Sequence, residues 1–126
     1  MRGRILIVDD SPTLVRTLAT DLIEAGYAVE TATSTEEALS KLNGVSFDLA
    51  IIDIRLPRVS GLELLCQIKR DNPALAAIII TAYESLDTAV RSMRAGAWDY
   101  FVKPLNLDEL KESIGRFFQN RPAPSL

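Results

Sequence analysis

Residues 5–12 read ILIVDDSP, an apolar run that ends abruptly on two neighbouring carboxylates, Asp9 and Asp10. Four large aliphatic residues in succession are typical of a strand that is covered on both faces. Two unit charges about 4 Å apart repel each other by roughly 4 kcal/mol at an effective dielectric near 20. Either a divalent cation offsets this repulsion or bulk water at a loop screens it, and both interpretations fit this stretch taken alone.

The residues after this run have the pattern of a helix. Ser11 followed by Pro12 is typical of a helix cap and a first helical residue, because the first turn does not use the N–H that proline lacks. Leu14, Leu18 and Leu22 then recur at every fourth position, which predicts one apolar helical face. The opening of the chain therefore predicts a strand followed directly by a helix.

The same strand–helix unit recurs five times along the chain. Short apolar runs predict strands at residues 5–8, 27–32, 47–52, 77–81 and 98–102. Polar caps predict further helix starts at Ser34, Ser60 and Asn106, and glycines predict helix ends at Gly26, Gly44 and Gly96. Strand–helix alternation of this kind implies a parallel sheet with helices on both faces.

The strands differ in character, and the difference predicts their order. Residues 5–8 and 78–80 are uniformly apolar, as strands in the middle of a sheet should be. The second strand alternates apolar and polar residues, and Asp99 interrupts the last strand, so we expect both at the edges. The order 2-1-3-4-5 satisfies these conditions and allows right-handed crossovers. We therefore predict an α/β, doubly wound, flavodoxin-like (βα)5 fold with a crevice between strands 1 and 3.

Composition argues against several classes of function. A chain of 126 residues suits one domain, and its net charge of −3 argues against direct nucleic-acid binding. The absence of histidine removes Ser-His and Cys-His catalysis, and a single cysteine, Cys66, removes internal disulfides. Cys66 lies among leucines at helical spacing, which predicts a core or boundary position. No apolar run reaches the ~20 residues of a membrane span, and we expect a cytoplasmic protein without a signal peptide.

Polar side chains follow the predicted strands at the crevice. Asp9 and Asp10 end strand 1 and Asp53 ends strand 3, and neighbouring strands lie roughly 4.8 Å apart. Oxygen ligands without histidine or cysteine favour Mg²⁺. Thr81 ends strand 4 and Lys103 ends strand 5, and a hydroxyl and an ammonium beside a metal suit a phosphoryl group. Aspartyl phosphate is an established type of covalent intermediate, so Asp53 is the best candidate acceptor.

These motifs together resemble the receiver domain of two-component response regulators, from Arg4 to about Phe118. The matching residues are Asp9-Asp10, Asp53, Thr81 and Lys103-Pro104 at strand ends, together with Pro57, Gly61 and Tyr100. Residues 81–104, TAYESLDTAVRSMRAGAWDYFVKP, most resemble receivers attached to enhancer-dependent transcription activators. The motifs are individually common, and their combination in this order makes the resemblance specific.

The resemblance implies a metal site and a phosphoacceptor. Asp53 would accept a phosphoryl group from a histidine kinase or a phosphotransfer protein. Asp10, Asp53 and the backbone carbonyl of Arg55 would bind Mg²⁺, and Asp9 would act mostly through metal-bound water. Such a protein catalyses its own phosphorylation and dephosphorylation and is not a turnover enzyme in the usual sense.

The resemblance also implies a switch. Lys103 and Thr81 would each contact a phosphoryl oxygen, and a cis peptide bond would join Lys103 to Pro104. Movement of Thr81 would allow Tyr100 to rotate inward, although an ordinary half-buried edge aromatic is the alternative for Tyr100. The face made by the fourth helix, expected near residues 85–95, the fifth strand and the fifth helix would then serve dimerisation or an attached domain.

Two other functions stay open at this point. A Mg²⁺-dependent phosphohydrolase with an aspartate nucleophile typically has a second aspartate two residues later, where this chain has Arg55. A phosphorylation-independent binding module would not need the intact set of site residues. We assign residues 1–119 to the receiver domain and the proline-rich residues 120–126 to a tail or linker stub, with a frayed terminus as the alternative. An output domain beyond Leu126 is a further expectation.

Overall fold

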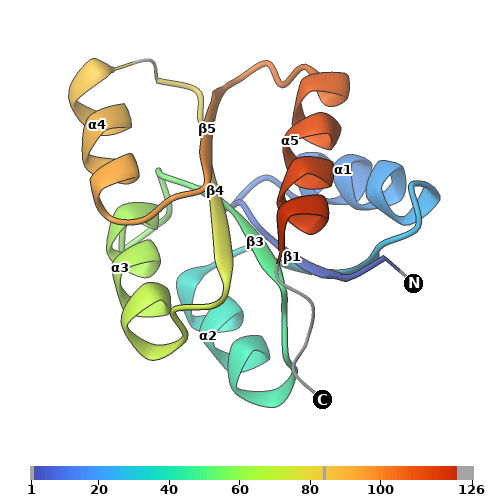
Figure 1. The fold of residues 1–126 in the computed structure, drawn as a ribbon. Coiled ribbons are helices and arrows are strands. Elements are labelled where there is room, and N and C mark those ends of the chain that lie inside the picture. Colours follow the sequence, from blue (N-terminus) through green and yellow to red (C-terminus); the bar gives the residue numbers. More distant parts are fainter. Residues whose placement is uncertain (1, 84, 122–126) are drawn as a thin grey trace.

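The computed structural model describes residues 2–83 and 85–121, which form a sheet covered by helices on both faces (Figure 1). The strands are β1 (Arg4–Val8), β2 (Ala28–Ala32), β3 (Leu49–Asp53), β4 (Ala76–Thr81) and β5 (Asp99–Val102). All neighbouring strands are parallel, and their order is β2-β1-β3-β4-β5. The predicted fold class and strand order are therefore confirmed.

Five helices connect the strands, and they divide between the two faces of the sheet. They are α1 (Pro12–Glu24), α2 (Thr35–Gly44), α3 (Gly61–Asp71), α4 (Leu86–Arg94) and α5 (Leu107–Asn120). Figure 1 shows α1 and α5 together on one side of the sheet, with α2, α3 and α4 on the other. This division leaves β1 and β3 at the point where successive connections depart to opposite faces, which is where ligands bind in open α/β sheets.

The core lies in two layers, one on each face of the sheet. Along β1, Ile5 and Ile7 belong to the layer beneath α1 and α5, whereas Leu6 and Val8 belong to the layer beneath α2 and α3. All four side chains are fully buried. Because successive side chains of a strand point to opposite faces, burial on both sides requires the continuous apolar run that opens the chain.

The predicted helix caps are present. Side-chain oxygens of Ser11, Ser34, Ser60 and Asn106 each accept a hydrogen bond from the backbone N–H three residues later. Ser85 makes the same contact at the start of α4, where no cap was predicted. Glu37 departs from the capping-box pattern, because its carboxylate accepts from the N–H of Thr33 rather than from that of Ser34. Gly26 and Gly96 follow their helices at φ 103°, a conformation that favours glycine, whereas Gly44 is the last residue of α2.

The prediction that Cys66 lies in the core or at its boundary is wrong, because its side chain is exposed on α3. The neighbouring Leu64, Leu65 and Ile68 are buried and belong to the core layer beneath α2 and α3. Most of the predicted tail, residues 122–126, lies outside the described residues.

Within residues 2–83 and 85–121, none of the helices has the length and apolar character needed to cross a membrane.

Candidate functional site

The carboxyl ends of β1 and β3 bring three carboxylates together. Asp9 and Asp10 directly follow β1, and Asp53 is the last residue of β3, which pairs with β1 along its length. Ligand oxygens of the three residues lie within 4.8 Å of one another. Asp9 is fully buried and Asp53 is 4% exposed, whereas Asp10 faces solvent. The clustering predicted from the strand ends is therefore present.

Lys103, which directly follows β5, contacts two of these carboxylates. Its Nζ donates to Oδ2 of Asp9 at 2.7 Å and to Oδ2 of Asp53 at 3.2 Å. The backbone N–H of Lys103 donates to the carbonyl of Thr81 at 2.7 Å, and the peptide bond between Lys103 and Pro104 is cis, as the resemblance implied. The ammonium therefore supplies the positive charge that partly offsets the two buried carboxylates.

Burial and these ion pairs perturb the titration of two groups. Burial raises the pKa of the Asp53 carboxyl, and the nearby Asp9 charge acts in the same direction. The N–H of Arg55 and the ammonium of Lys103 oppose this shift without cancelling it. For Lys103, burial lowers the pKa, but the hydrogen bonds and charges of Asp9 and Asp53 outweigh burial and raise it overall. Lys103 is therefore a stable cation at neutral pH.

The polar side chains at the ends of β1, β3 and β4 each accept a hydrogen bond from the backbone N–H of the second residue after them. Asp9 Oδ1 accepts from the N–H of Ser11 at 2.9 Å, and Asp53 Oδ1 accepts from the N–H of Arg55 at 3.0 Å. Thr81 Oγ1 accepts from the N–H of Tyr83 at 3.1 Å. Such turns orient one oxygen toward the loop backbone. The second oxygens of Asp9 and Asp53 are thereby directed to Lys103.

Gly61 lets the loop after β3 return close to the acceptor. A Cβ on this residue would lie 2.1 Å from the backbone oxygen of Asp53 and 2.7 Å from Cα of Ile54. The N–H of Gly61 donates to the carbonyl of Ile54 at 2.8 Å, which holds the first residue of α3 against the end of β3. The sequence marked this glycine as a family position, and the structure shows the close approach that requires it.

Two further side chains flank the site. Thr81, which ends β4, is fully buried. Tyr100 is half-buried and packs against the core layer beneath α2 and α3, and its hydroxyl oxygen is buried. Sequence reasoning did not find the contact between Arg55 and Tyr83, in which the guanidinium carbon lies 4.7 Å from the ring centroid. Each of these two residues lies two positions after a site residue, but nothing in the sequence indicates that they meet.

The donor set is chemically suited to a small, hard cation. The clustered ligand atoms of Asp9, Asp10 and Asp53 are all carboxylate oxygens, and the chain has no histidine. Mg²⁺ prefers oxygen ligands, takes one or two carboxylates and keeps several waters, which the exposure of Asp10 allows.

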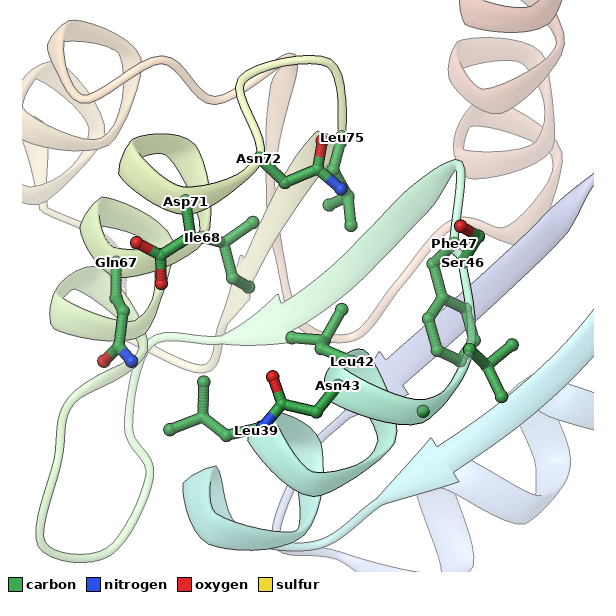
Figure 2. Close-up of a pocket in the computed structure, with 12 residues that line it drawn as sticks. Leu39, Leu42, Asn43, Ser46, Phe47, Gln67, Ile68, Asp71, Asn72 and Leu75 are labelled. Carbon is green, nitrogen blue, oxygen red and sulfur yellow. The ribbon is translucent and has the colours of Figure 1, made fainter.

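A cavity of about 530 Å³ lies elsewhere, between α2 and α3 (Figure 2). Its walls include Leu39 and Leu42 from α2 and Gln67 and Ile68 from α3, with Asp71 at the edge. Asp71 is exposed, and no cluster of charged side chains converges on this cavity among the described residues. Among the described residues, the group of acidic side chains close enough to share a metal ion lies instead at the carboxyl ends of β1 and β3.

Comparison with known proteins agrees with this geometry. The family model described as response regulator receiver domain matches residues 5–115. The alginate biosynthesis transcriptional regulatory protein AlgB of Pseudomonas aeruginosa is 43% identical over 120 residues, which cover 95% of this chain and 27% of AlgB. The transcriptional regulatory protein ZraR of Klebsiella oxytoca is 42% identical over 110 residues, which cover 87% of this chain and 25% of ZraR. The chain thus spans about a quarter of the length of these relatives.

Comparison with solved structures also finds response regulators and their receiver domains. The response regulator TrrA of Thermotoga maritima, in complex with Mg²⁺ and BeF, has a TM-score of 0.82 and 40% sequence identity, over 90% of this chain and 97% of TrrA. The beryllofluoride-activated NtrC4 receiver domain dimer, solved in solution, has a TM-score of 0.88 and 31% identity, over 94% of this chain and 98% of that one.

Proposed function

The chain belongs to the response regulator receiver domain family, and from this premise we propose that it is a signalling switch whose phosphoacceptor is Asp53. The donor is a phosphohistidine on a histidine kinase or a phosphotransfer protein. The observation that carries the proposal is the convergence of Asp9, Asp10 and Asp53 with Lys103 at the carboxyl ends of β1, β3 and β5.

Transfer requires an in-line attack by one carboxylate oxygen of Asp53 on phosphorus. An O–P bond forms, the P–N bond to the donor imidazole breaks, and the imidazole leaves with the electron pair. Lys103 already lies 3.2 Å from Oδ2 of Asp53, so a small displacement brings its ammonium to a phosphoryl oxygen. The hydroxyl of Thr81 donates a hydrogen bond to a second phosphoryl oxygen. These groups stabilise charge that develops during transfer.

Mg²⁺ is the proposed cofactor, and it would neutralise phosphoryl charge when bound. Asp10, Asp53 and the backbone carbonyl of Arg55 are its proposed protein ligands, with Asp9 acting through metal-bound water. The all-oxygen donor set supports this assignment. The structure of TrrA, a complex with Mg²⁺ and BeF, supports the same chemistry in a relative.

The proposed output passes through Thr81 and Tyr100 to the face formed by α4, β5 and α5. On this face α4 exposes Leu86, Val90 and Met93, which recur at positions i, i+4 and i+7 and are 81%, 37% and 48% exposed. An apolar stripe of this kind marks an interaction surface. The NtrC4 receiver, which is a dimer when activated by beryllofluoride, supports dimerisation as one use of such a face.

The proposed context is a longer regulator. AlgB and ZraR are transcriptional regulatory proteins of which this chain matches about a quarter. We therefore propose that phosphorylation of this domain controls an attached output domain, and that nucleic-acid contacts belong to that domain because the receiver carries a net charge of −3.

Incubation with acetyl phosphate and Mg²⁺ tests the proposed function. The switch should acquire about one equivalent of acid-labile, hydroxylamine-sensitive phosphate, and Asp53→Asn should acquire none while keeping its circular dichroism spectrum. Steady release of inorganic phosphate from small esters would instead indicate a phosphohydrolase. A chain that takes up no phosphate would be a binding module, and undiminished labelling of Asp53→Asn would place the acceptor elsewhere.

A further inference from the structure

A buried hydroxyl links the start of α2 to the loop that follows β3. Thr35 is the first residue of α2, and its side chain is 2% exposed. Its hydroxyl donates to the backbone carbonyl of Val59 at 3.2 Å, although the two residues are 24 positions apart in the chain. Val59 belongs to the β3–α3 loop, residues 54–60, all of which the structure describes. Because Ser34 caps α2, the Thr35 hydroxyl serves this contact between elements rather than the helix itself.

The β3–α3 loop is closed at its base and unfavourable at its far end. The N–H of Gly61 donates to the carbonyl of Ile54 at 2.8 Å, which closes the base. At the far end, Arg58 has φ 67°, a left-handed conformation that a residue with a Cβ rarely adopts. Such a conformation persists only where the surrounding structure holds it. Val59, which Thr35 holds, directly follows this residue, so the hydrogen bond acts where the loop needs support.

A second contact from α2 reaches the same loop, but it is weaker. Glu36 and Arg58 form an ion pair at 3.7 Å, with side chains that are 59% and 83% exposed. An exposed pair of this kind contributes little, because water screens it and both side chains lose freedom. By contrast, the hydrogen bond of Thr35 is partly buried, and removing its donor would leave a carbonyl without its partner. Thr35 is therefore the main attachment of α2 to the loop.

We propose that Thr35 is a positioning residue for the metal site. The loop that it holds contains Arg55, whose backbone carbonyl is a proposed ligand of Mg²⁺. By fixing Val59, the Thr35 hydroxyl restricts the conformations of the loop before the cation arrives, so less conformational entropy is lost when Mg²⁺ binds. This inference rests on the proposed function and adds to it a residue of α2 that acts on the metal site only through the loop.

Mg²⁺ affinity and amide hydrogen exchange test this role. Thr35→Val keeps the shape of the side chain and removes the hydroxyl, so isothermal titration with Mg²⁺ alone should show an affinity about three- to fivefold lower. Thr35→Ser keeps the hydroxyl and should restore most of the affinity. In EDTA, the N–H of Gly61 should exchange about threefold faster in Thr35→Val than in the unmodified chain, because the loop opens more often.

Ser92 on α4 provides a matched control. It is fully buried, and its hydroxyl donates to the carbonyl of Thr88 at 2.8 Å. Ser92→Ala removes a bond of the same kind and should leave the Mg²⁺ affinity unchanged. If the unmodified chain binds Mg²⁺, an unchanged affinity in Thr35→Val, or equal losses in Thr35→Val and Ser92→Ala, would overturn the positioning role alone. Failure of the unmodified chain to bind Mg²⁺ would overturn this role and the proposed metal site together.

Discussion

Lys103 donates a 2.7 Å hydrogen bond to Asp9, a residue from the opposite end of the chain. The Asp9 side chain is fully buried, and that of Lys103 is 19% exposed. Breaking a buried ion pair by removing one partner is strongly destabilising, because the other charge stays buried without compensation. Removal of either partner is therefore expected to destabilise the resting site.

Lys103→Met should lower the free energy of unfolding by about 2 to 4 kcal/mol in EDTA, because it leaves Asp9 and Asp53 without a cation. Mg²⁺ should restore part of this loss by neutralising the same carboxylates. Arg70→Met is the control: it removes the exposed pair with Asp71 and should cost less than about 1 kcal/mol. Urea denaturation measures both, and equal losses would contradict the role of Lys103.

Asp53→Asn should stabilise the metal-free protein in a pH-dependent way. Burial raises the pKa of Asp53 in the folded state above its ordinary value near 3.8, so ionisation of this carboxyl opposes folding. The native chain therefore loses stability as pH rises from below that value through the raised folded-state pKa, and the asparagine variant does not. Urea titrations in EDTA should show an advantage for Asp53→Asn that grows across this window and then levels off. A constant or shrinking advantage would contradict the clustering argument.

Gly61→Ala should damage the site, because its Cβ would meet the backbone oxygen of Asp53 at 2.1 Å. Relief of this clash must move the β3–α3 loop, at a cost of about 1 to 3 kcal/mol and with slower phosphorylation by acetyl phosphate. The control is Gly115→Ala in α5, where nothing lies within 4 Å of the new methyl group. There we expect a gain of about 0.5 to 1 kcal/mol, because alanine is the better helix former. Similar losses in both variants would contradict the argument from close approach.

Beryllofluoride with Mg²⁺ should change the conformation well beyond the acceptor. Phosphorylation takes Asp53 to about two negative charges and adds acceptor oxygens, so the hydroxyl of Thr81 should turn toward them. Chemical-shift changes should then extend to α4 and Tyr100, and Thr81→Ala should bind beryllofluoride without transmitting those changes. Shifts confined to the loops around Asp53 in the unmodified chain would contradict the switch.

Leu86→Glu should weaken association of the activated protein, because it places a charge within the exposed apolar stripe of α4. Phosphate uptake should be unaffected. Ile23→Glu is the matched control, since Ile23 is 54% exposed on α1. Analytical ultracentrifugation with beryllofluoride and Mg²⁺ measures the association. Equal effects of the two substitutions would show that α4 is not the interface.

Local patterns along the chain were sufficient to predict the fold and the clustering of Asp9, Asp10 and Asp53. The run at residues 5–8 could be assigned to a strand buried on both faces because every one of its side chains is apolar. The cap at Ser11 and the helical spacing after it follow from hydrogen bonds and periodicity within a few residues. Strand ends then predicted the neighbours Asp9 and Asp53, because the carboxyl ends of parallel strands meet at one edge.

The tertiary structure decided which loop segments approach one another. Gly61 meets the backbone of Asp53, and Arg55 stacks on Tyr83, only because of the paths that the β3–α3 and β4–α4 loops take in space. The exposure of Cys66 likewise depends on how α3 is rotated against the sheet. Periodicity and capping are local properties that neighbouring residues determine. The approach of two loops depends on the packing of the whole sheet and its helices, and no short stretch of the sequence encodes it.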